Sequence, residues 1–257
     1  MINVVQLGSI SYAEGLKLQE ELVSARKEHR IPDTLLLLEH TPVITLGRNA
    51  KRAHVLASDA LLAQRGVDLF ECNRGGDVTF HGPGQLVGYP IFNILEMQPR
   101  LGAVDFVRRL EEVLIRTCAG FGIATHRVAG LTGVWTEVAT DSTSHGPMTN
   151  GQRPAAESKI AAIGIHISRG VTSHGFALNV NTDLDWFRLI VPCGIAAKPV
   201  TSMQRELGAT VDFAAVAQAA ARNFGGVFGS QVLWSQGLEQ AIGSASAVAS
   251  ARENSTQ

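Results

Sequence analysis

The strongest structural signal in this sequence is the apolar run at residues 34–40, TLLLLEH. Its length is typical of a β-strand, and Thr41-Pro42 interrupts the run before the residues VITLG follow. We therefore predict two adjacent strands in this region. The longest apolar stretch of the chain falls far short of the roughly 20 residues that cross a bilayer, so we expect no membrane partner.

Helical patterns occur in three other parts of the chain. Ser11 lies three residues before Glu14, which is the spacing of a capping box, and predicts a helix that runs to about His29. Apolar residues recur at helical spacing in residues 103–119 and again in residues 211–224. Each of these segments is therefore predicted to be an amphipathic helix.

Strand patterns are interspersed with these helices. Residues 85–91, 160–168 and 171–181 are predicted strands, because apolar and small or polar residues alternate along the last two of them. No internal repeat is visible. The mixture predicts an α/β fold in which helices pack on a mixed sheet, without a regular βαβ repeat.

Composition and charge narrow the classes of function. Of the 257 residues, 45% are hydrophobic and 18% are charged, and the formal net charge is −1, which gives no electrostatic reason to expect a nucleic-acid partner. The three cysteines lack CxxC spacing, which argues against a disulfide framework or a zinc site. The first residues lack the pattern of a secretory signal, so we expect a cytoplasmic protein. We predict one domain over residues 1–240 and a disordered tail over residues 241–257.

A glycine-rich segment at residues 74–85, RGGDVTFHGPGQ, holds the densest concentration of polar side chains. Glycine lets a backbone approach a ligand closely, and Arg74 and His81 offer hydrogen-bond donors at the rim. We interpret the segment as a ligand-binding loop, and a tight turn between two strands is the structural alternative. It is not a phosphate loop, because it lacks both the GK[ST] ending and the GxGxxG pattern.

Lys159 stands at the head of a predicted strand. By strand parity it faces the same way as Ala161, Ile163, Ile165 and Ile167, the face that we expect to be buried. A lysine that points toward a core needs a partner for its charge. The alternative is a lysine at the end of a strand whose amine reaches water.

Cys193 lies between a proline and a glycine, which indicates a tight, accessible turn, whereas we interpret Cys72 and Cys118 as structural. Only a few per cent of a free cysteine is thiolate at neutral pH. An ammonium group beside the thiol favours the thiolate, and the same amine can move a proton during acyl transfer. Lys159 and Cys193 would therefore be a chemically sensible pair, although the residues alone do not show that the two are close.

Together these motifs resemble the octanoyltransferases of lipoate biosynthesis over residues 31–208. Five ordered blocks carry the resemblance: LLLLEHTPVITLGR at 35–48, RGGDVTFHGPGQLVGYPI at 74–91, GLTGVW at 130–135, KIAAIGIHISRGVTSHGFALNVN at 159–181 and VPCGI at 191–195. The resemblance implies the fold of the catalytic domain that biotin and lipoate protein ligases share. It also implies that residues 1–240 form an acyltransferase domain.

The resemblance implies that Cys193 is the nucleophile that accepts the acyl group and that Lys159 lowers the pKa of its thiol. The substrate-binding positions of the family fall on three segments of this chain, namely Arg74, Gly75, Gly76, Asp77, Val78, Thr79, Phe80 and His81, then Ala162, Ile163 and Gly164, and then Gly175, Phe176 and Ala177. We predict that the small residues among them leave room for an acyl chain between strands.

The implied reaction moves an octanoyl group from octanoyl-acyl carrier protein to Cys193. It then moves the group to a lysine of a lipoyl domain of a 2-oxoacid dehydrogenase, or of the glycine cleavage H protein. Conversion of a thioester to an amide runs downhill, so we expect no ATP and no cofactor, and we expect a monomer. Because acyl carrier proteins are acidic, we expect a basic patch around the site, formed by Arg48, Lys51, Arg52 and Arg74.

Three alternatives stay open. An ATP-dependent lipoate or biotin protein ligase shares the implied fold but needs no cysteine nucleophile. A non-catalytic acyl-binding protein keeps the pocket and is expected to lack Cys193 or Lys159, both of which are present. A metal site of His81, His174 and Cys193 has no supporting spacing. Residues 137–157 look longer than the usual link in this family, and we expect a surface loop or flap there.

Overall fold

The computed structural model describes residues 1–136, 157–191, 199–235 and 237. The strands are β1 (Ile2–Ile10), β2 (Asp33–His40), β3 (Val43–Leu46), β4 (Asp68–Glu71), β5 (Val78–His81), β6 (Gln85–Ile91), β7 (His126–Val128), β8 (Leu131–Thr136), β9 (Ser158–Ser168), β10 (Val171–Asn179) and β11 (Val232–Ser235). The α-helices are α1 (Tyr12–Lys27), α2 (Asp59–Gln64), α3 (Ala103–Ala119), α4 (Met203–Leu207) and α5 (Phe213–Phe228), with 3₁₀ turns η1 (Arg52–His54) and η2 (Leu184–Leu189).

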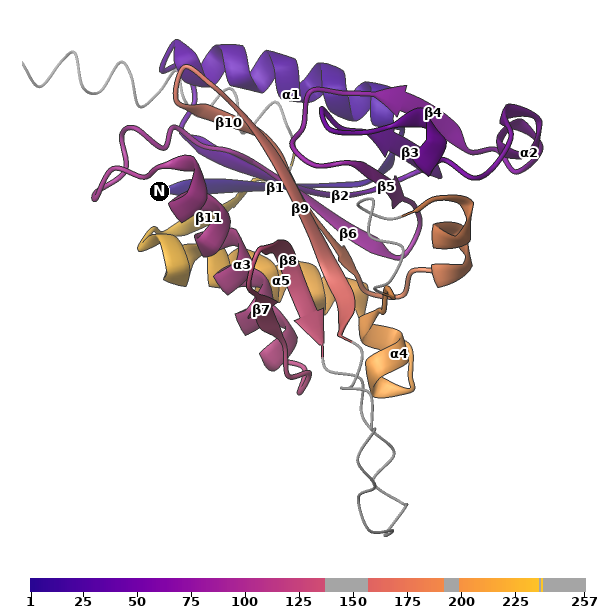
Figure 1. Ribbon diagram of the computed structural model, residues 1–257. Helices are drawn as coiled ribbons and strands as arrows, with labels where there is room; N and C mark the ends of the chain where they lie inside the picture. The colour runs from indigo at the N-terminus through magenta and orange to yellow at the C-terminus, as the bar shows by residue number, and fades with distance from the viewer. Residues whose placement is uncertain (137–156, 192–198, 236, 238–257) are drawn as a thin grey trace, which may run out of the picture.

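Within the described residues, eight strands form one large sheet in the order β11-β1-β2-β6-β10-β9-β8-β7. β1 runs parallel to β2 and β11, and the other neighbouring pairs are antiparallel. Helix α1 covers one face of this sheet, and α3 and α5 cover the other (Figure 1). The predicted α/β fold with a mixed sheet is therefore confirmed.

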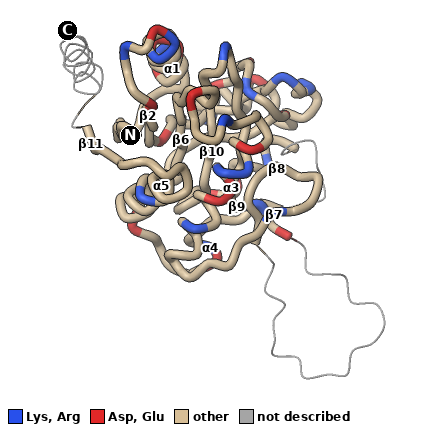
Figure 2. The backbone as a smooth tube through the Cα atoms, turned by 90° about the vertical axis from the view of Figure 1, so that its left-hand side faces the viewer, with Lys and Arg blue, Asp and Glu red and all other residues tan. Residues whose placement is uncertain are grey.

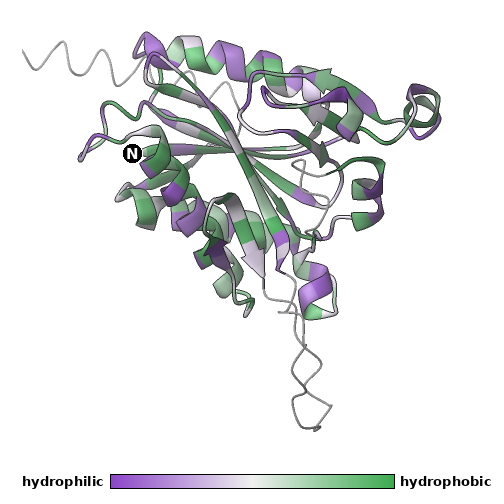
Figure 3. Ribbon diagram, in the orientation of Figure 1, coloured by the Kyte–Doolittle hydropathy of each residue, from purple (hydrophilic) through white to green (hydrophobic). Residues whose placement is uncertain are grey.

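β2 lies in the middle of the large sheet, which explains the apolar run at residues 34–40. Leu35 and Leu37 pack into the core under α3 and α5, while Leu36 and Leu38 pack toward α1. All four side chains are at most 2% exposed. A strand with both faces covered reads as a continuous apolar segment. Figure 3 shows green apolar segments on the central strands of the sheet.

A second sheet, with strand order β4-β3-β5, lies beside the large one. The prediction of two adjacent strands at residues 34–46 is correct for the strands themselves, but β2 and β3 belong to different sheets. All four residues of β3 are buried, and Ile44 and Leu46 pack in a separate core with α2 and η2. Pro42 lies in the link between the two strands, and it lacks the N–H that a continuing ladder would use.

The predicted helices are present with small shifts at their ends. Ser11 Oγ accepts a hydrogen bond from the Glu14 amide at 3.2 Å, and Glu14 Oε2 accepts one from the Ser11 amide at 2.9 Å, so the capping box is confirmed. Helix α3 has the predicted bounds, whereas α5 starts at Phe213 behind its N-cap Asp212 and continues to Phe228. The outer helix α1 carries both acidic and basic positions in Figure 2, as expected for a helix with one solvated face.

Three sequence predictions lie outside the described residues: the loop at 137–157, apart from Glu157, the turn at Cys193, and the tail at 241–257. Among the helices that the structure does describe, none is long and apolar enough to cross a membrane.

Candidate functional site

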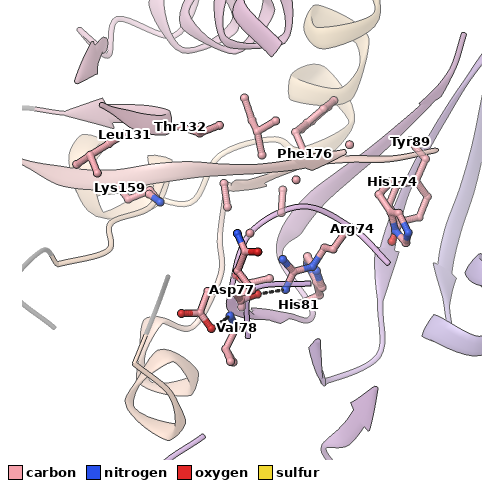
Figure 4. Close-up of a pocket in the computed structure, with 18 of the residues that line it drawn as sticks. Arg74, Asp77, Val78, His81, Tyr89, Leu131, Thr132, Lys159, His174 and Phe176 are labelled. Carbon is pink, nitrogen blue, oxygen red and sulfur yellow. Dashed lines mark hydrogen bonds between the residues drawn. The ribbon is translucent and has the colours of Figure 1, made fainter. Parts of the chain in front are cut away.

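A cavity of about 290 Å³ lies between the large sheet and the loop that leads into β5. Its walls come from that loop and from β5, β6, β8, β9 and β10 (Figure 4). Tyr12 of α1 also lines it. The structure brings most of the predicted substrate-binding residues to this cavity: Arg74, Gly76, Asp77, Val78, Thr79, His81, Ala162, Ile163, Gly164, Gly175, Phe176 and Ala177. A cavity of this size suits a small ligand.

Two of the predicted binding residues are not among those that line the cavity. The amide of Gly75 donates a hydrogen bond to the Ile165 carbonyl at 2.9 Å, so this glycine attaches the loop to β9. Phe80 is fully buried in the core of the second sheet, where its ring stacks on Trp186 at a centroid distance of 5.4 Å. Because side chains alternate along a strand, Phe80 points away from the cavity that its neighbours Thr79 and His81 line.

Arg74 is a corrected prediction, because its guanidinium is not at the rim. The side chain is 8% exposed, and its Nη2 donates to the Thr45 carbonyl at 2.7 Å and to the Asp77 carbonyl at 2.6 Å. Nε donates to Thr45 Oγ1 at 3.1 Å, and Nη1 donates to the Gly75 carbonyl at 3.0 Å. Arg74 therefore attaches the glycine-rich loop to β3. Because it is buried, it does not belong to the basic surface patch that the sequence predicted.

The role of the small residues also differs from the prediction. A Cβ on Gly164 would lie 2.6 Å from the Gly75 carbonyl oxygen, and a Cβ on Gly175 would lie 2.1 Å from the Gly88 carbonyl oxygen. Neighbouring backbone already occupies that space. These glycines therefore permit close packing of backbone around the cavity, and they do not themselves provide the room for a chain.

The orientation of Lys159 follows from a shift in register between β8 and β9. Val134 pairs with Ala161, but the next residue, Trp135, pairs with Lys159, so Ile160 is one extra residue on β9. Ile160 and Ala161 are both buried in the core under α3 and α5. Two successive residues on one face are the mark of a β-bulge.

This bulge overturns the parity argument for Lys159. The side chain does not share the helix-covered face of Ala161, and it lines the cavity together with Ala162 and Gly164. Its Nζ lies 4.6 Å from the centroid of the Trp135 ring. In Figure 4, Lys159 lies at one end of the cavity with Leu131 and Thr132, and Tyr89 and His174 lie at the other.

The far end of the cavity is polar and aromatic. His40 Nδ1 lies 3.0 Å from the Ile10 carbonyl, to which it must donate, so Nε2 accepts the hydrogen bond from the Tyr89 hydroxyl at 2.6 Å. The Tyr12 ring packs edge-on against His40 at 5.3 Å. Burial raises the pKa of both Tyr12 and Tyr89, so both phenols stay protonated.

The hydrogen bonds around His81 likewise fix it in one tautomer. Gln85 Nε2 donates to Asn179 Oδ1 at 2.9 Å, which leaves Gln85 Oε1 to accept from His81 Nδ1 at 2.8 Å. Burial lowers the pKa of His81 to about 3, and burial likewise lowers the pKa of His40 and of His174 to about 4. All three imidazoles are therefore neutral at pH 7. The charged group at this end of the cavity is the guanidinium of Arg74, which lowers the pKa of His81 and of His174 further.

Sequence reasoning did not identify Tyr12, Tyr89, Leu131 and Thr132 as parts of the site. The last three lie in blocks that carry the family resemblance, which was the available signal. No sequence signal pointed to Tyr12. It directly follows a helix cap, and it lines the cavity only because α1 packs on the sheet.

Cys193 lies outside the described residues, with the rest of segment 192–198. The described residues on both sides of that segment contact the site. The Val191 amide donates to the His54 carbonyl at 2.7 Å, and His54 Nδ1 lies 2.6 Å from Asp77 Oδ2 in the cavity wall. On the other side, the Lys159 amide donates to the Pro199 carbonyl at 2.9 Å. Among the described residues, no group of three or more His, Cys, Asp or Glu side chains is arranged to hold a metal ion.

This mixed sheet, with a cavity lined by a glycine-rich loop and a lysine on a strand, defines the class of lipoate-ligase-like catalytic domains. A bi-partite lipoate protein ligase from Thermoplasma acidophilum has the same fold, with a TM-score of 0.66 at 16% identity over 96% of this chain and 91% of that one. The chain belongs to the lipoyl protein ligase A/B catalytic domain family, whose model matches residues 11–225.

Curated relatives narrow the comparison further. An octanoyltransferase of Koribacter versatilis is 57% identical over 242 residues, which cover 94% of this chain and 90% of the relative. An octanoyltransferase of Acidobacterium capsulatum is 57% identical over 241 residues, which cover 91% of this chain and 93% of the relative. The resemblance to octanoyltransferases is therefore confirmed across nearly the whole chain.

Proposed function

We propose that this protein is an octanoyltransferase that carries an octanoyl group from acyl carrier protein to a lysine of a lipoyl domain, through a thioester on Cys193. The names of its relatives support the reaction class. The cavity supports the substrate, since apolar residues such as Ile163 and Phe176 wall a space that has Lys159 at one end and neutral histidines at the other. These features suit a short aliphatic chain with its carbonyl near Lys159.

The observation that carries the proposal is that both ends of the segment that holds Cys193 are attached to residues around the cavity, one of them Lys159 itself. Pro199 contacts the backbone of Lys159, and Val191 is attached to His54, which pairs with Asp77 of the cavity wall. Cys193 is only two residues from Val191 along the chain. Chain connectivity thus supports placing the sulfur near the cavity.

In the first half-reaction, the Cys193 thiolate attacks the carbonyl carbon of the octanoyl thioester. The bond from that carbon to the donor sulfur breaks, and the departing thiolate takes the proton of the Lys159 ammonium. The products are an octanoyl-enzyme thioester, a neutral lysine and the free carrier thiol.

In the second half-reaction, the amine of the acceptor lysine attacks the same carbonyl carbon. The Cys193 sulfur leaves as a thiolate, and the proton lost by the new amide nitrogen returns to Lys159, which restores the starting pair. A thioester is replaced by an amide, so the balance needs no ATP. This distinguishes the proposal from an ATP-dependent ligase of the same fold.

Fewer basic residues than expected are available on the surface to bind an acidic carrier protein. Arg74 is buried, and Arg52 forms an ion pair with Asp59. Arg48 and Lys51 are exposed in the link that follows β3, beside Asn49 of the cavity wall. We propose these two as the contacts of an acidic carrier protein.

The test is intact-mass measurement of the protein after mixing with octanoyl-carrier protein and no ATP. We expect the wild type to gain one octanoyl group on Cys193 and to lose it when a lipoyl domain is added. Cys193→Ser should gain none, and Lys159→Met should acylate about 10²-fold to 10⁴-fold more slowly.

Cys72→Ser is the matched control, because Cys72 is partly accessible, whereas Cys118 is buried. It should acylate like the wild type. An adduct that persists in Cys193→Ser, or octanoylation of the lipoyl domain that requires ATP and free octanoate, would refute the proposal.

A further inference from the structure

We propose that Trp135 is a positioning residue for Lys159, whose ammonium group it holds at the reactive end of the cavity through its indole face. The inference rests on the proposed function and adds a residue to it. Lys159 Nζ lies 4.6 Å from the centroid of the Trp135 ring, within the distance at which a cation is attracted to an aromatic face. Tryptophan is the strongest of the aromatic side chains in this interaction.

The backbone of β8 and β9 brings the two side chains together. The register shift that makes Ile160 an extra residue places Trp135 directly opposite Lys159. Without this bulge, Trp135 would oppose Ile160, and Lys159 would turn toward the helix-covered core. The bulge and the ring thus act on the same side chain: one turns it into the cavity and the other holds its charged end.

Gly133 of β8 leaves room for the aliphatic part of the Lys159 side chain. Its φ is +121°, a value that side chains rarely allow, and a Cβ built there would lie 3.5 Å from Lys159 Cε and 2.6 Å from the Ala161 carbonyl oxygen. The aliphatic stem of Lys159 therefore passes close over the glycine toward the ring. A residue with a side chain at position 133 would strain β8 and crowd that stem.

The ring itself is rigidly supported. Trp135 is 1% exposed, so the indole has little freedom to move away. The amide of Gly133 donates to the fully buried carboxylate of Glu111 at 3.2 Å, which attaches β8 to α3. Arg127 Nε lies 3.1 Å from the same carboxylate. The aromatic face is thus presented from a fixed strand.

The contact between Lys159 and the Trp135 ring affects the protonation state of the lysine. The quadrupole of the ring attracts an ammonium group and gives no comparable attraction to a neutral amine. The contact therefore favours the protonated lysine, which in turn favours the Cys193 thiolate that starts the reaction. The attraction acts before any thiolate is present, so the cation is already in position when the acyl donor arrives.

The test is the pH dependence of iodoacetamide alkylation at Cys193, followed by peptide mass mapping in the full-length protein. Trp135→Leu and Trp135→Phe both shrink this buried side chain, but only the phenylalanine keeps an aromatic face. We expect the alkylation midpoint of Trp135→Leu to rise by about 0.5 to 1 pH unit. Trp135→Phe should show a smaller rise of the same sign.

A double-mutant cycle separates this role from core packing. In the Lys159→Met background, Trp135→Leu should leave the alkylation midpoint unchanged, because the cation is gone. Phe106→Leu, in the core under α3 and away from the cavity, should also leave it unchanged. If Trp135→Leu does not fold, the Trp135→Phe midpoint decides alone.

Two results would overturn the inference. One is an unchanged midpoint in both Trp135 variants, and the other is a shift that persists in the Lys159→Met background. Failure of the proposed function is seen elsewhere, as the absence of an octanoyl adduct on wild-type Cys193, and it does not depend on the alkylation profile.

Discussion

At the scale of single residues, the site depends on glycines where backbone meets aromatic rings. Gly88 of β6 lies beneath Phe176, and a Cβ built on it would lie 2.1 Å from Cε1 and 2.2 Å from Cζ of that ring. Phe176 is 3% exposed and stacks on Phe224 at 6.0 Å, so displacement of the ring would either lose this packing or fill part of the cavity. The position of the Phe176 ring in the cavity wall therefore requires a glycine at position 88.

We expect Gly88→Ala to lower the free energy of unfolding by about 1 to 3 kcal/mol, as overpacking does in a dense core. Gly226→Ala is the matched control, since that glycine is exposed in α5 and a Cβ there meets nothing within 4 Å. It should instead raise the free energy of unfolding by about 0.5 to 1 kcal/mol through helix propensity. Urea denaturation measures both, and a neutral Gly88→Ala would contradict the packing argument.

At the scale of elements, the position of β8 depends on a buried charge on α3. Glu111 is fully buried, and its carboxylate accepts hydrogen bonds from Arg108 Nη1 at 2.7 Å, from Arg127 Nε at 3.1 Å and from the Gly133 amide at 3.2 Å. A buried carboxylate is stable only while such donors surround it. Loss of one donor therefore costs more than loss of a surface ion pair.

We expect Arg127→Met to lower the free energy of unfolding by about 2 kcal/mol, the cost of removing a hydrogen bond to a buried charge. Arg116→Met is the control, because Arg116 pairs with Glu112 at the surface of the same helix, at 2.9 Å with a 53% exposed arginine. That change should cost less than about 0.5 kcal/mol. If both substitutions lower the free energy of unfolding equally, the hydrogen bond from Arg127 to the buried carboxylate contributes no more than a surface ion pair.

At the scale of the whole molecule, three neutral histidines are enclosed between the two sheets and α1. Burial lowers the pKa of His40 and His174 to about 4 and of His81 to about 3, below the ordinary value of 6.5. Between these values and 6.5 the unfolded chain binds protons that the folded protein excludes. The free energy of unfolding must therefore fall as the pH drops from about 6.5 toward 4.

We expect stability measured by urea denaturation to be lower at pH 5 than at pH 7. His40→Gln should flatten this dependence, because one histidine contributes up to about 1.4 kcal/mol per pH unit in that range. Burial raises the pKa of Asp33, which acts with the opposite sign, so the slope of the variant must be compared with that of the wild type. An identical slope would mean that His40 is protonated in the fold.

Local patterns in the sequence were sufficient for the α/β class, for the capping box at Ser11, for helix α3 and for the loop that begins at Arg74. These features depend on hydrogen bonds and side-chain periodicity within a few residues, which a single segment already contains. The family blocks also predicted most of the residues that line the cavity.

Only the tertiary structure decided how Lys159, Arg74 and Tyr12 face the site. A one-residue bulge at Ile160 reverses strand parity, and it depends on pairing with β8, which no pattern within β9 reveals. Arg74 turned inward because Thr45, far from it in the chain, supplies acceptors. Contacts between distant segments set these orientations, and their energies are absent from any local pattern.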